Sequence, residues 1–304
     1  MNVRRPFVAV SIAFLFGAAC SDTPPPADQG AGSETGSSYL GQAPPGMTPE
    51  LFAPGVISTD GREFAISFSP DGLECFFTMS LETNTLMVTR EIGGEWTEPR
   101  VASFSGRYFD FEPLFVPAGN RVYFGSRRPF EGSGDPIDIH QWYMERTATG
   151  WSEPKPTESP FRERFVMYLT HAANGNAYFT GDDGIYVSRF VDGVYQDPER
   201  LGHNINYLPW AAHPYVAPDE SYLLYDAQPV EGNADLFVSF RKEDGGWSRS
   251  VSLGDRFNTE EEDLAPFVTY DGRYLFFSRL TETSGDIYWV DATVIQEHRE
   301  EAGR

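Results

Sequence analysis

A repeat of about 50 residues constrains the fold of this chain more than any other feature of its sequence. Gly72, Gly119, Gly175, Glu220 and Gly272 occupy one position in five similar segments, with spacings of 47, 56, 45 and 52 residues. The segments read ISFSPDGLECFFT (66–78), PLFVPAGNRVYFGS (113–126), LTHAANGNAYFTG (169–181), PYVAPDESYLLYD (214–226) and PFVTYDGRYLFFS (266–278). Since such self-similarity is typical of repeat architectures, we expect each copy to form one structural module.

Each repeat contains the elements of a four-stranded antiparallel sheet. Asp71-Gly72, Asn174-Gly175 and Asp271-Gly272 suit two-residue hairpins, because both central positions of the turn tolerate positive φ. A third β-rich run follows a variable loop, as in TLMVTR (85–90) and DIYWVD (286–291). A fourth run comes next and is opened by Trp96, Trp151, Tyr195 or Trp247. Four short strands in every repeat predict the blades of a β-propeller.

The two ends of the repeat region predict how the ring closes. The last repeat stops after its third run, at Asp291, and lacks a Trp-led fourth strand. Ahead of the first repeat, ELFAPGVIS (50–58) has the apolar character of a fourth strand. We therefore predict an all-β fold, a five-bladed β-propeller of four-stranded antiparallel blades over residues 50–291, closed by an N-terminal strand. Such closure leaves no long free edge, and residues 292–304 are expected to form a short surface helix with a frayed end.

The repeat resembles the PD40, or WD40-like, repeats of TolB-type propellers. The residues that carry the resemblance are SPDG (69–72), WSEP (151–154), APDE (217–220) and DIY (286–288). The third repeat departs from the pattern, because Ala173-Asn174 replaces the Pro-Asp pair. The resemblance implies the propeller fold and says little of function, since propellers carry many different activities.

The N-terminus has the pattern of a secretory signal peptide, residues 1–19. Arg4 and Arg5 precede an apolar run (7–16), and small residues lead to Cys20. This arrangement resembles the lipobox of bacterial lipoproteins, although Gly17 stands where an aliphatic residue is usual. The resemblance implies cleavage before Cys20 and lipidation of Cys20, and Ser21 favours the outer membrane. An ordinary signal peptide with a free Cys20 is the alternative.

Composition separates the tether from the globular part and limits the partners. Residues 20–49 are rich in Pro, Gly, Ser and acid, so we expect them to be a lipidated N-terminus with a disordered tether. The formal net charge of −22 argues against nucleic-acid binding, which requires a basic surface. Cys75, in a strand-like run, is expected to be a buried hydrophobe. No cofactor motif occurs, and none of the five histidines has the i,i+4 spacing of a helical metal site, so no cofactor or metal is expected.

The loops between strands 2 and 3, and between successive blades, are long and lie on one face of a propeller. Loops on a rigid scaffold commonly carry binding sites. Five arginines fall in loops of blades two and three on this face: Arg107, Arg127, Arg128, Arg162 and Arg164. They would bind a carboxylate or phosphate, or they would pair with neighbouring acids such as Asp110, Glu112 and Glu163.

Two further sets of residues are candidates. Glu112, Tyr168 and His213 align at one position just before the first strand of blades two, three and four, where blades one and five have Ala65 and Ala265. Converging there, they would do acid–base work or would simply close the channel mouth by hydrogen bonding. His203, Asn206 and Trp210 share one loop and would bind a sugar, or they would form a self-satisfied loop.

Two functions follow from these expectations. The first is a monomeric, membrane-anchored envelope lipoprotein whose propeller is a binding or scaffolding module for a protein or glycan. The second is a carbohydrate-active enzyme, a lyase or hydrolase, acting on an acidic sugar at the channel mouth. The absence of any catalytic sequence motif favours the first.

Overall fold

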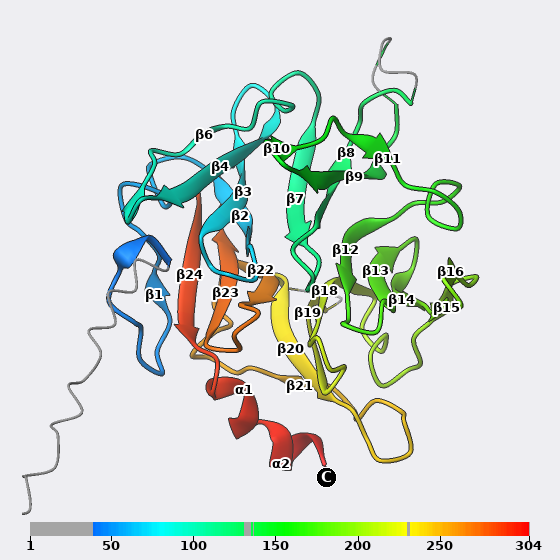
Figure 1. Ribbon diagram of the computed structural model, residues 1–304. Helices are drawn as coiled ribbons and strands as arrows, with labels where there is room; N and C mark the ends of the chain where they lie inside the picture. Colours follow the sequence, from blue (N-terminus) through cyan, green and yellow to red (C-terminus); the bar gives the residue numbers. More distant parts are fainter. Residues whose placement is uncertain (1–38, 131–134, 136, 230–231, 304) are drawn as a thin grey trace, which may run out of the picture. The chain divides into compact units, whose positions relative to one another are not determined.

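Five antiparallel sheets form a ring in the computed structural model, which describes residues 39–130, 135, 137–229 and 232–303 (Figure 1). The predicted five-bladed β-propeller is confirmed. Cys20 and the signal peptide lie outside the described residues. In the described part, no helix is long and apolar enough to cross a membrane.

Each blade is built from consecutive strands, as its hairpin turns require. Blade one contains β2 (Glu63–Phe68), β3 (Glu74–Ser80), β4 (Asn84–Ile92), β5 (Glu95–Trp96) and β6 (Arg100–Val101). Blade two contains β7 (Asp110–Phe115), β8 (Arg121–Ser126), β9 (His140–Thr147), β10 (Gly150–Trp151) and β11 (Lys155–Pro156). In both blades the outermost position is divided between two short strands, which pair with β4 or β9.

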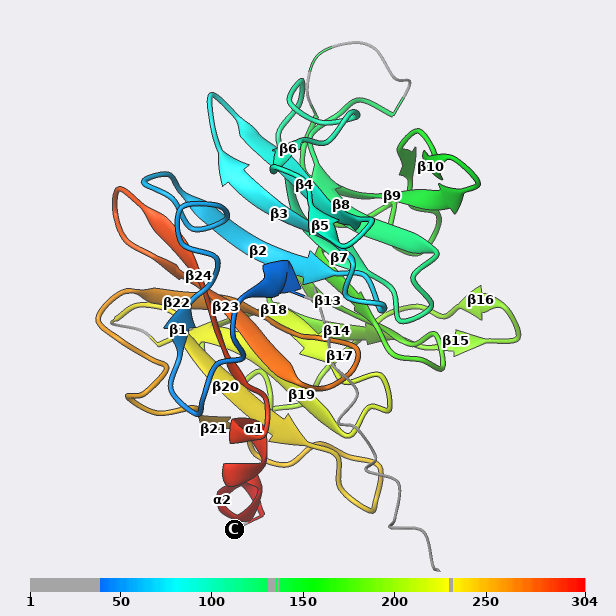
Figure 2. The same cartoon turned by 60° about the vertical axis from the view of Figure 1, so that its left-hand side comes forward.

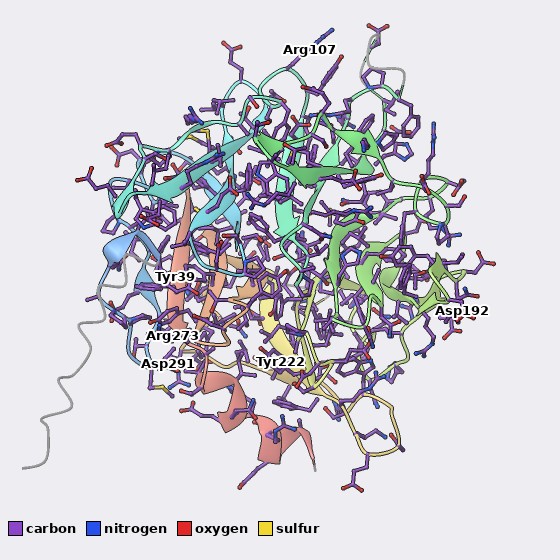
Figure 3. All side chains as sticks on the ribbon, in the orientation of Figure 1. Tyr39, Arg107, Asp192, Tyr222, Arg273 and Asp291 are labelled. Atoms are coloured by element: carbon purple, nitrogen blue, oxygen red, sulfur yellow. The ribbon has the colours of Figure 1, made fainter. Side chains whose placement is uncertain are left out.

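The other three blades follow the same order. Blade three contains β12 (Met167–His171), β13 (Ala177–Gly181), β14 (Gly184–Ser188) and β17 (Glu199–Arg200). A separate hairpin of β15 (Phe190–Val191) and β16 (Val194–Tyr195) extends from blade three, with Asp192 at its tip (Figure 3). Blade four contains β18 (Trp210–Val216), β19 (Tyr222–Gln228), β20 (Asp235–Phe240) and β21 (Val251–Ser252). Blade five contains β22 (Glu262–Val268), β23 (Tyr274–Leu280) and β24 (Gly285–Asp291).

The N-terminal strand closes the ring, as predicted. β1 (Glu50–Leu51) pairs antiparallel with β24, and the two lie side by side in both views (Figures 1 and 2). Phe52 follows β1 and is fully buried, with its ring 4.9 Å from Phe276 and 5.1 Å from Trp289. This burial of aromatic surface stabilises the junction between the first and last repeats.

Two segments outside 50–291 also belong to the core. The 3-10 turn Tyr39–Gly41 lies in the stretch expected to be a tether, but Tyr39 is buried and packs edge-on against Phe68. The C-terminal α1 (Val294–Glu297) and α2 (Arg299–Ala302) are helical as expected, yet Val294 and Ile295 are fully buried in the same core cluster. The apolar surface of these residues holds both segments on the propeller, so packing against the core begins at Tyr39, ahead of residue 50.

Candidate functional site

The innermost strand of every blade has a bulge at the position that the sequence alignment singled out. Pairing of the first two strands is interrupted there in all five blades. The residues at this position have φ between 46° and 55°, and all five carry side chains: Ala65, Glu112, Tyr168, His213 and Ala265. Non-glycine residues rarely adopt this left-handed conformation, so the surrounding structure must hold it in place.

Side chains of the preceding blade hold four of these five residues. The backbone N–H groups of Ala65, Glu112, His213 and Ala265 each donate a 2.9 Å hydrogen bond to an oxygen on the second strand of the blade before them. The acceptors are Ser278, Thr78, Thr180 and Asp226, respectively. Blade two has Gly125 at the matching position, where a Cβ would lie 2.4 Å from the Phe111 ring. These bonds form a polar belt that links adjacent blades.

Glu112, Tyr168 and His213 converge, but inside the protein rather than at an open mouth. His213 Nδ1 lies 2.8 Å from Asp226 Oδ1, and its Nε2 lies 3.1 Å from Glu112 Oε1. The Tyr168 ring packs edge-on against the imidazole with centroids 5.2 Å apart. Tyr168 is fully buried and donates its hydroxyl hydrogen to Pro266 O, at 2.9 Å. The cluster therefore joins blades two, three, four and five.

The charges and the burial of this cluster explain why both His213 and Tyr168 hold their protons. Burial alone would lower the pKa of His213, but the charges and hydrogen bonds of Asp226 and Glu112 outweigh burial and raise that pKa well above its usual value. Burial raises the pKa of Tyr168 further, so its hydroxyl remains protonated. An imidazolium between two buried carboxylates gives each of them a cationic partner. Both imidazole nitrogens already have protein partners, so neither is free for a ligand.

The five candidate arginines have different environments. Arg128 is buried, and its Nη2 lies 2.8 Å from Oδ1 of Asp110. Arg107 lies over the Tyr108 ring, at the outer edge of the molecule (Figure 3), and Arg162 lies over the Phe130 ring, at 5.0 Å and 4.5 Å respectively. Arg127 and Arg164 alone among the five line a common pocket.

That pocket, of about 470 Å³, lies on the predicted face between blades two and three. Arg127 is 5.8 Å from the centroid of the Phe109 ring and has no ion pair among the described residues. Arg164 donates from Nε to Pro160 O, and its nearest carboxylate is that of Asp197, an exposed side chain 3.9 Å away. The other residues that line the pocket are Asp138, Ile139, His140, Glu163, Phe165 and Asp182. Its walls thus combine cations with carboxylates.

The loop that contains His203, Asn206 and Trp210 does not gather these residues around a ligand. Asn206 is buried, accepts a hydrogen bond from Ile185 N and donates to the carbonyls of Ile185 and Leu201. His203 lines a different pocket, between blades three and four, while Trp210 is exposed at the start of β18. Asn206 therefore fastens the loop to blade three.

Sequence reasoning missed Asp226 and an aromatic pocket. Asp226 occupies the position of Thr78, Thr180 and Ser278 in other repeats. A carboxylate where the other repeats have a hydroxyl side chain could have identified Asp226 from the sequence. The aromatic pocket lies between blades two and three and is lined in part by Tyr123, Tyr143, Phe161 and Tyr195. These tyrosines belong to strands of different blades, and only the fold brings them together. No cluster of His, Cys, Asp and Glu among the described residues has the arrangement of a metal site.

Comparison with solved structures places the fold among known propellers. TolB from Acinetobacter baumannii superposes with a TM-score of 0.51 at 13% identity, over 79% of this chain and 54% of that one. This chain thus spans about half the length of that TolB. An endo-arabinase from Bacteroides thetaiotaomicron superposes with a TM-score of 0.50 at 14% identity, over 82% of this chain and 97% of that one. No family model and no curated protein sequence matches the chain. At these identities the likeness concerns the fold alone, which is the propeller expected from the TolB-type repeats.

Proposed function

We propose that this chain is a lipoprotein of the bacterial cell envelope whose propeller is a binding module for a protein or glycan. Cys20 would carry the lipid, and the outer membrane is the location that Ser21 favours. The observation that supports ligand binding most directly is the pocket lined by Arg127 and Arg164, because Arg127 has no ion pair among the described residues and Arg164 has only the exposed Asp197, at 3.9 Å. Guanidinium groups left this way are suited to a carboxylate or phosphate of a ligand.

The central cluster supports binding over catalysis at the channel. A general acid or base must reach a proton of the substrate. His213 faces Glu112 and Asp226 with its two ring nitrogens, and the Tyr168 hydroxyl donates a hydrogen bond to a backbone carbonyl. The second candidate, an enzyme acting on an acidic sugar, would require these contacts to be broken.

Two experiments test the proposal. Replacement Cys20→Ser should move the protein from the membrane to the soluble fraction, and intact-mass analysis of the wild type should find a lipid on Cys20. An unmodified Cys20 would refute the anchor.

For ligand binding, the purified protein is titrated with acidic glycans and acidic peptides. The double replacement Arg127→Ala with Arg164→Ala should abolish binding, while Arg273→Ala should not. Arg273 is exposed, as Arg127 is, and lies over an aromatic ring, that of Tyr274, but it belongs to a strand 1–2 turn of blade five. Absence of binding to every probe, or equal loss in both variants, would contradict the proposed site.

A further inference from the structure

We propose that the ligand is an acidic oligosaccharide that contacts two pockets bordered by the same loop, with a carboxylate at Arg127 and Arg164 and another sugar ring of the same chain in the aromatic pocket. This inference rests on the proposed binding function and specifies the ligand class of that site. Three observations support it: the aromatic pocket, the loop that borders both pockets, and the mixture of charges in the pocket of Arg127 and Arg164.

The aromatic pocket is small, and its aromatic side chains offer flat surfaces on which one sugar ring can stack. Its volume is about 260 Å³. The rings of Tyr123 and Tyr143 lie 5.6 Å apart at an angle of 36°, and those of Phe161 and Tyr195 lie 4.8 Å apart, nearly edge-on. Tyr123 and Phe161 are buried, whereas Tyr143 and Tyr195 are half-exposed and available to a ligand. Rigid aromatic side chains provide large contact area at a low cost in conformational entropy.

Polar groups at the same pocket complement hydroxyl groups. Arg121 lies over the Tyr143 ring at 4.8 Å and is held by Glu145, with 2.7 Å between Nη2 and Oε1. Glu158 and Ser159 also line the pocket. The wall thus combines aromatic rings with polar groups, and placed polar groups are what orient a ligand in a small-molecule site.

His171 supports the aromatic pocket from behind. Its imidazole stacks on Tyr123 with centroids 4.6 Å apart, and neither ring nitrogen has a hydrogen-bond partner among the residues that the structure describes. Burial, and secondarily the charge of Arg121, lowers the pKa of His171 to about 3, so the ring is neutral. A neutral ring in this place fixes Tyr123 without introducing a charge, which preorganises the pocket.

The loop of residues 157–165 borders both pockets. Phe161 N and Arg162 N both donate to Glu158 O, at 3.0 Å and 3.3 Å. Phe161 lines the aromatic pocket, and Arg164, three residues later, lines the pocket that it shares with Arg127. On β9, Tyr143 of the aromatic pocket follows His140 of the other pocket by three residues, which is about 10 Å along a strand. Different units of one short oligosaccharide can therefore contact both pockets.

The charges of the pocket at Arg127 and Arg164 favour a sugar acid over a polyphosphate. Asp138, Glu163 and Asp182 line it together with the two arginines. Carboxylates accept hydrogen bonds from hydroxyl groups, while they repel a ligand of high negative charge. A uronic acid offers one carboxylate to the arginines and several hydroxyls to the acids. Two small pockets also differ from the broad interface of about 800 Å² per partner that a folded protein requires.

Isothermal titration with the whole protein tests this inference. The probes are trigalacturonate, muramyl-containing oligosaccharides, their single-sugar units, neutral oligosaccharides of equal length and an acidic peptide. We expect at least one acidic oligosaccharide to bind at least tenfold more tightly than its single unit. Tyr195→Ala should remove that advantage and leave binding of the single unit unchanged, whereas Tyr195→Phe should retain it.

The control is Tyr288→Ala, a half-exposed tyrosine of β24 on blade five that also stacks on a phenylalanine. If Tyr195→Ala binds the oligosaccharide as the wild type does while the arginine double variant does not, the two-pocket inference fails and the proposed binding site survives. Equal or tighter binding of the acidic peptide also overturns the inference. If no acidic probe of either class binds, the proposed site fails as well.

Discussion

The imidazole of His213 lies 3.1 Å from the carboxylate of Glu112, although 101 positions separate these residues in the chain. The contact joins the innermost strands of blades two and four. Asp226 binds the other imidazole nitrogen and also accepts a hydrogen bond from Ala265 N in blade five. One histidine thus bridges two buried carboxylates from different blades.

Replacement of His213 should destabilise the fold strongly. His213→Ala leaves two buried carboxylates without their cation, and removal of one partner from a buried ion pair costs about 3–5 kcal/mol. The control is His203→Ala, an exposed histidine whose replacement should change stability by about 0.5 kcal/mol at most. Urea denaturation at pH 7 measures both free energies of unfolding. Similar values for the two variants would show that the central cluster contributes little.

The same histidine should give stability a pH dependence. The folded protein holds the His213 proton above the ordinary pKa of 6.5, so it binds more protons than the unfolded chain between pH 6.5 and the raised pKa. The contribution is fully present below pH 6.5 and is lost as pH rises through the raised pKa. Denaturation of the wild type and of His213→Gln at several pH values above 6.5 should show a steeper fall for the wild type. Parallel profiles would contradict the assignment.

Replacement of Arg127 and replacement of Arg128 should have very different effects on stability, although the two residues are adjacent. Arg128 Nη2 contacts Asp110, and its Nε donates to Ser126 Oγ at 2.9 Å, all in a buried setting. Arg128→Ala should therefore lower the free energy of unfolding by about 3–5 kcal/mol. Arg127→Ala should change it by about 0.5 kcal/mol at most, because Arg127 is exposed and has no ion pair within the described part of the chain. Thermal melts of both variants test this difference, and equal melting temperatures would refute it.

Tyr39 should stabilise the propeller although it precedes every blade. Its ring packs 5.0 Å from Tyr274, and its hydroxyl donates to Asp271 Oδ2 at 2.9 Å. Tyr39→Ala should cost about 3–5 kcal/mol, as expected for truncating a large buried ring. Tyr39→Phe should cost about 1 kcal/mol, since only the hydrogen bond is lost. A melting temperature of Tyr39→Ala equal to that of the wild type would restore the tether interpretation of this segment.

Deletion of residues 50–58 should expose the edge of β24. Glu50 and Leu51 pair with Trp289 and Tyr288, and Phe52 N donates to Ile287 O at 2.8 Å. Loss of this strand and of the Phe52 ring should lower stability by several kcal/mol, roughly the cost of losing one packed strand. Val56→Ala, at an exposed position of the same segment, is the control. Hydrogen exchange should find faster exchange in β24 only in the deletion variant, and unchanged protection there would refute closure by β1.

Cys75 should be inert to thiol reagents in the native state. It is fully buried, and burial raises its pKa far above the ordinary value of a thiol. Because the thiolate is the reactive form, labelling at pH 8 should require unfolding. The experiment uses the Cys20→Ser variant, so that Cys75 is the remaining thiol. Rapid stoichiometric labelling without denaturant would contradict the burial of this side chain.

Much of the architecture followed from local patterns in the sequence. Asp-Gly and Asn-Gly turns, apolar runs and the recurring Trp-led strand are properties of neighbouring residues, and their repetition predicted five blades closed by residues 50–58. The alignment also identified the bulge position shared by Ala65, Glu112, Tyr168, His213 and Ala265, because equivalent positions in a closed ring face the same axis.

Only the tertiary structure decided what these residues do. Glu112, His213 and Asp226 meet because ring closure brings blades two and four together, and no local pattern encodes the resulting burial or the raised pKa of His213. Arg127 and Arg128 look alike in the sequence, yet one is exposed and the other is buried against Asp110. The aromatic pocket likewise exists only because β9 and β16 come from adjacent blades. Turns and strands depend on nearby residues, whereas burial and charge pairing depend on which distant segments pack together.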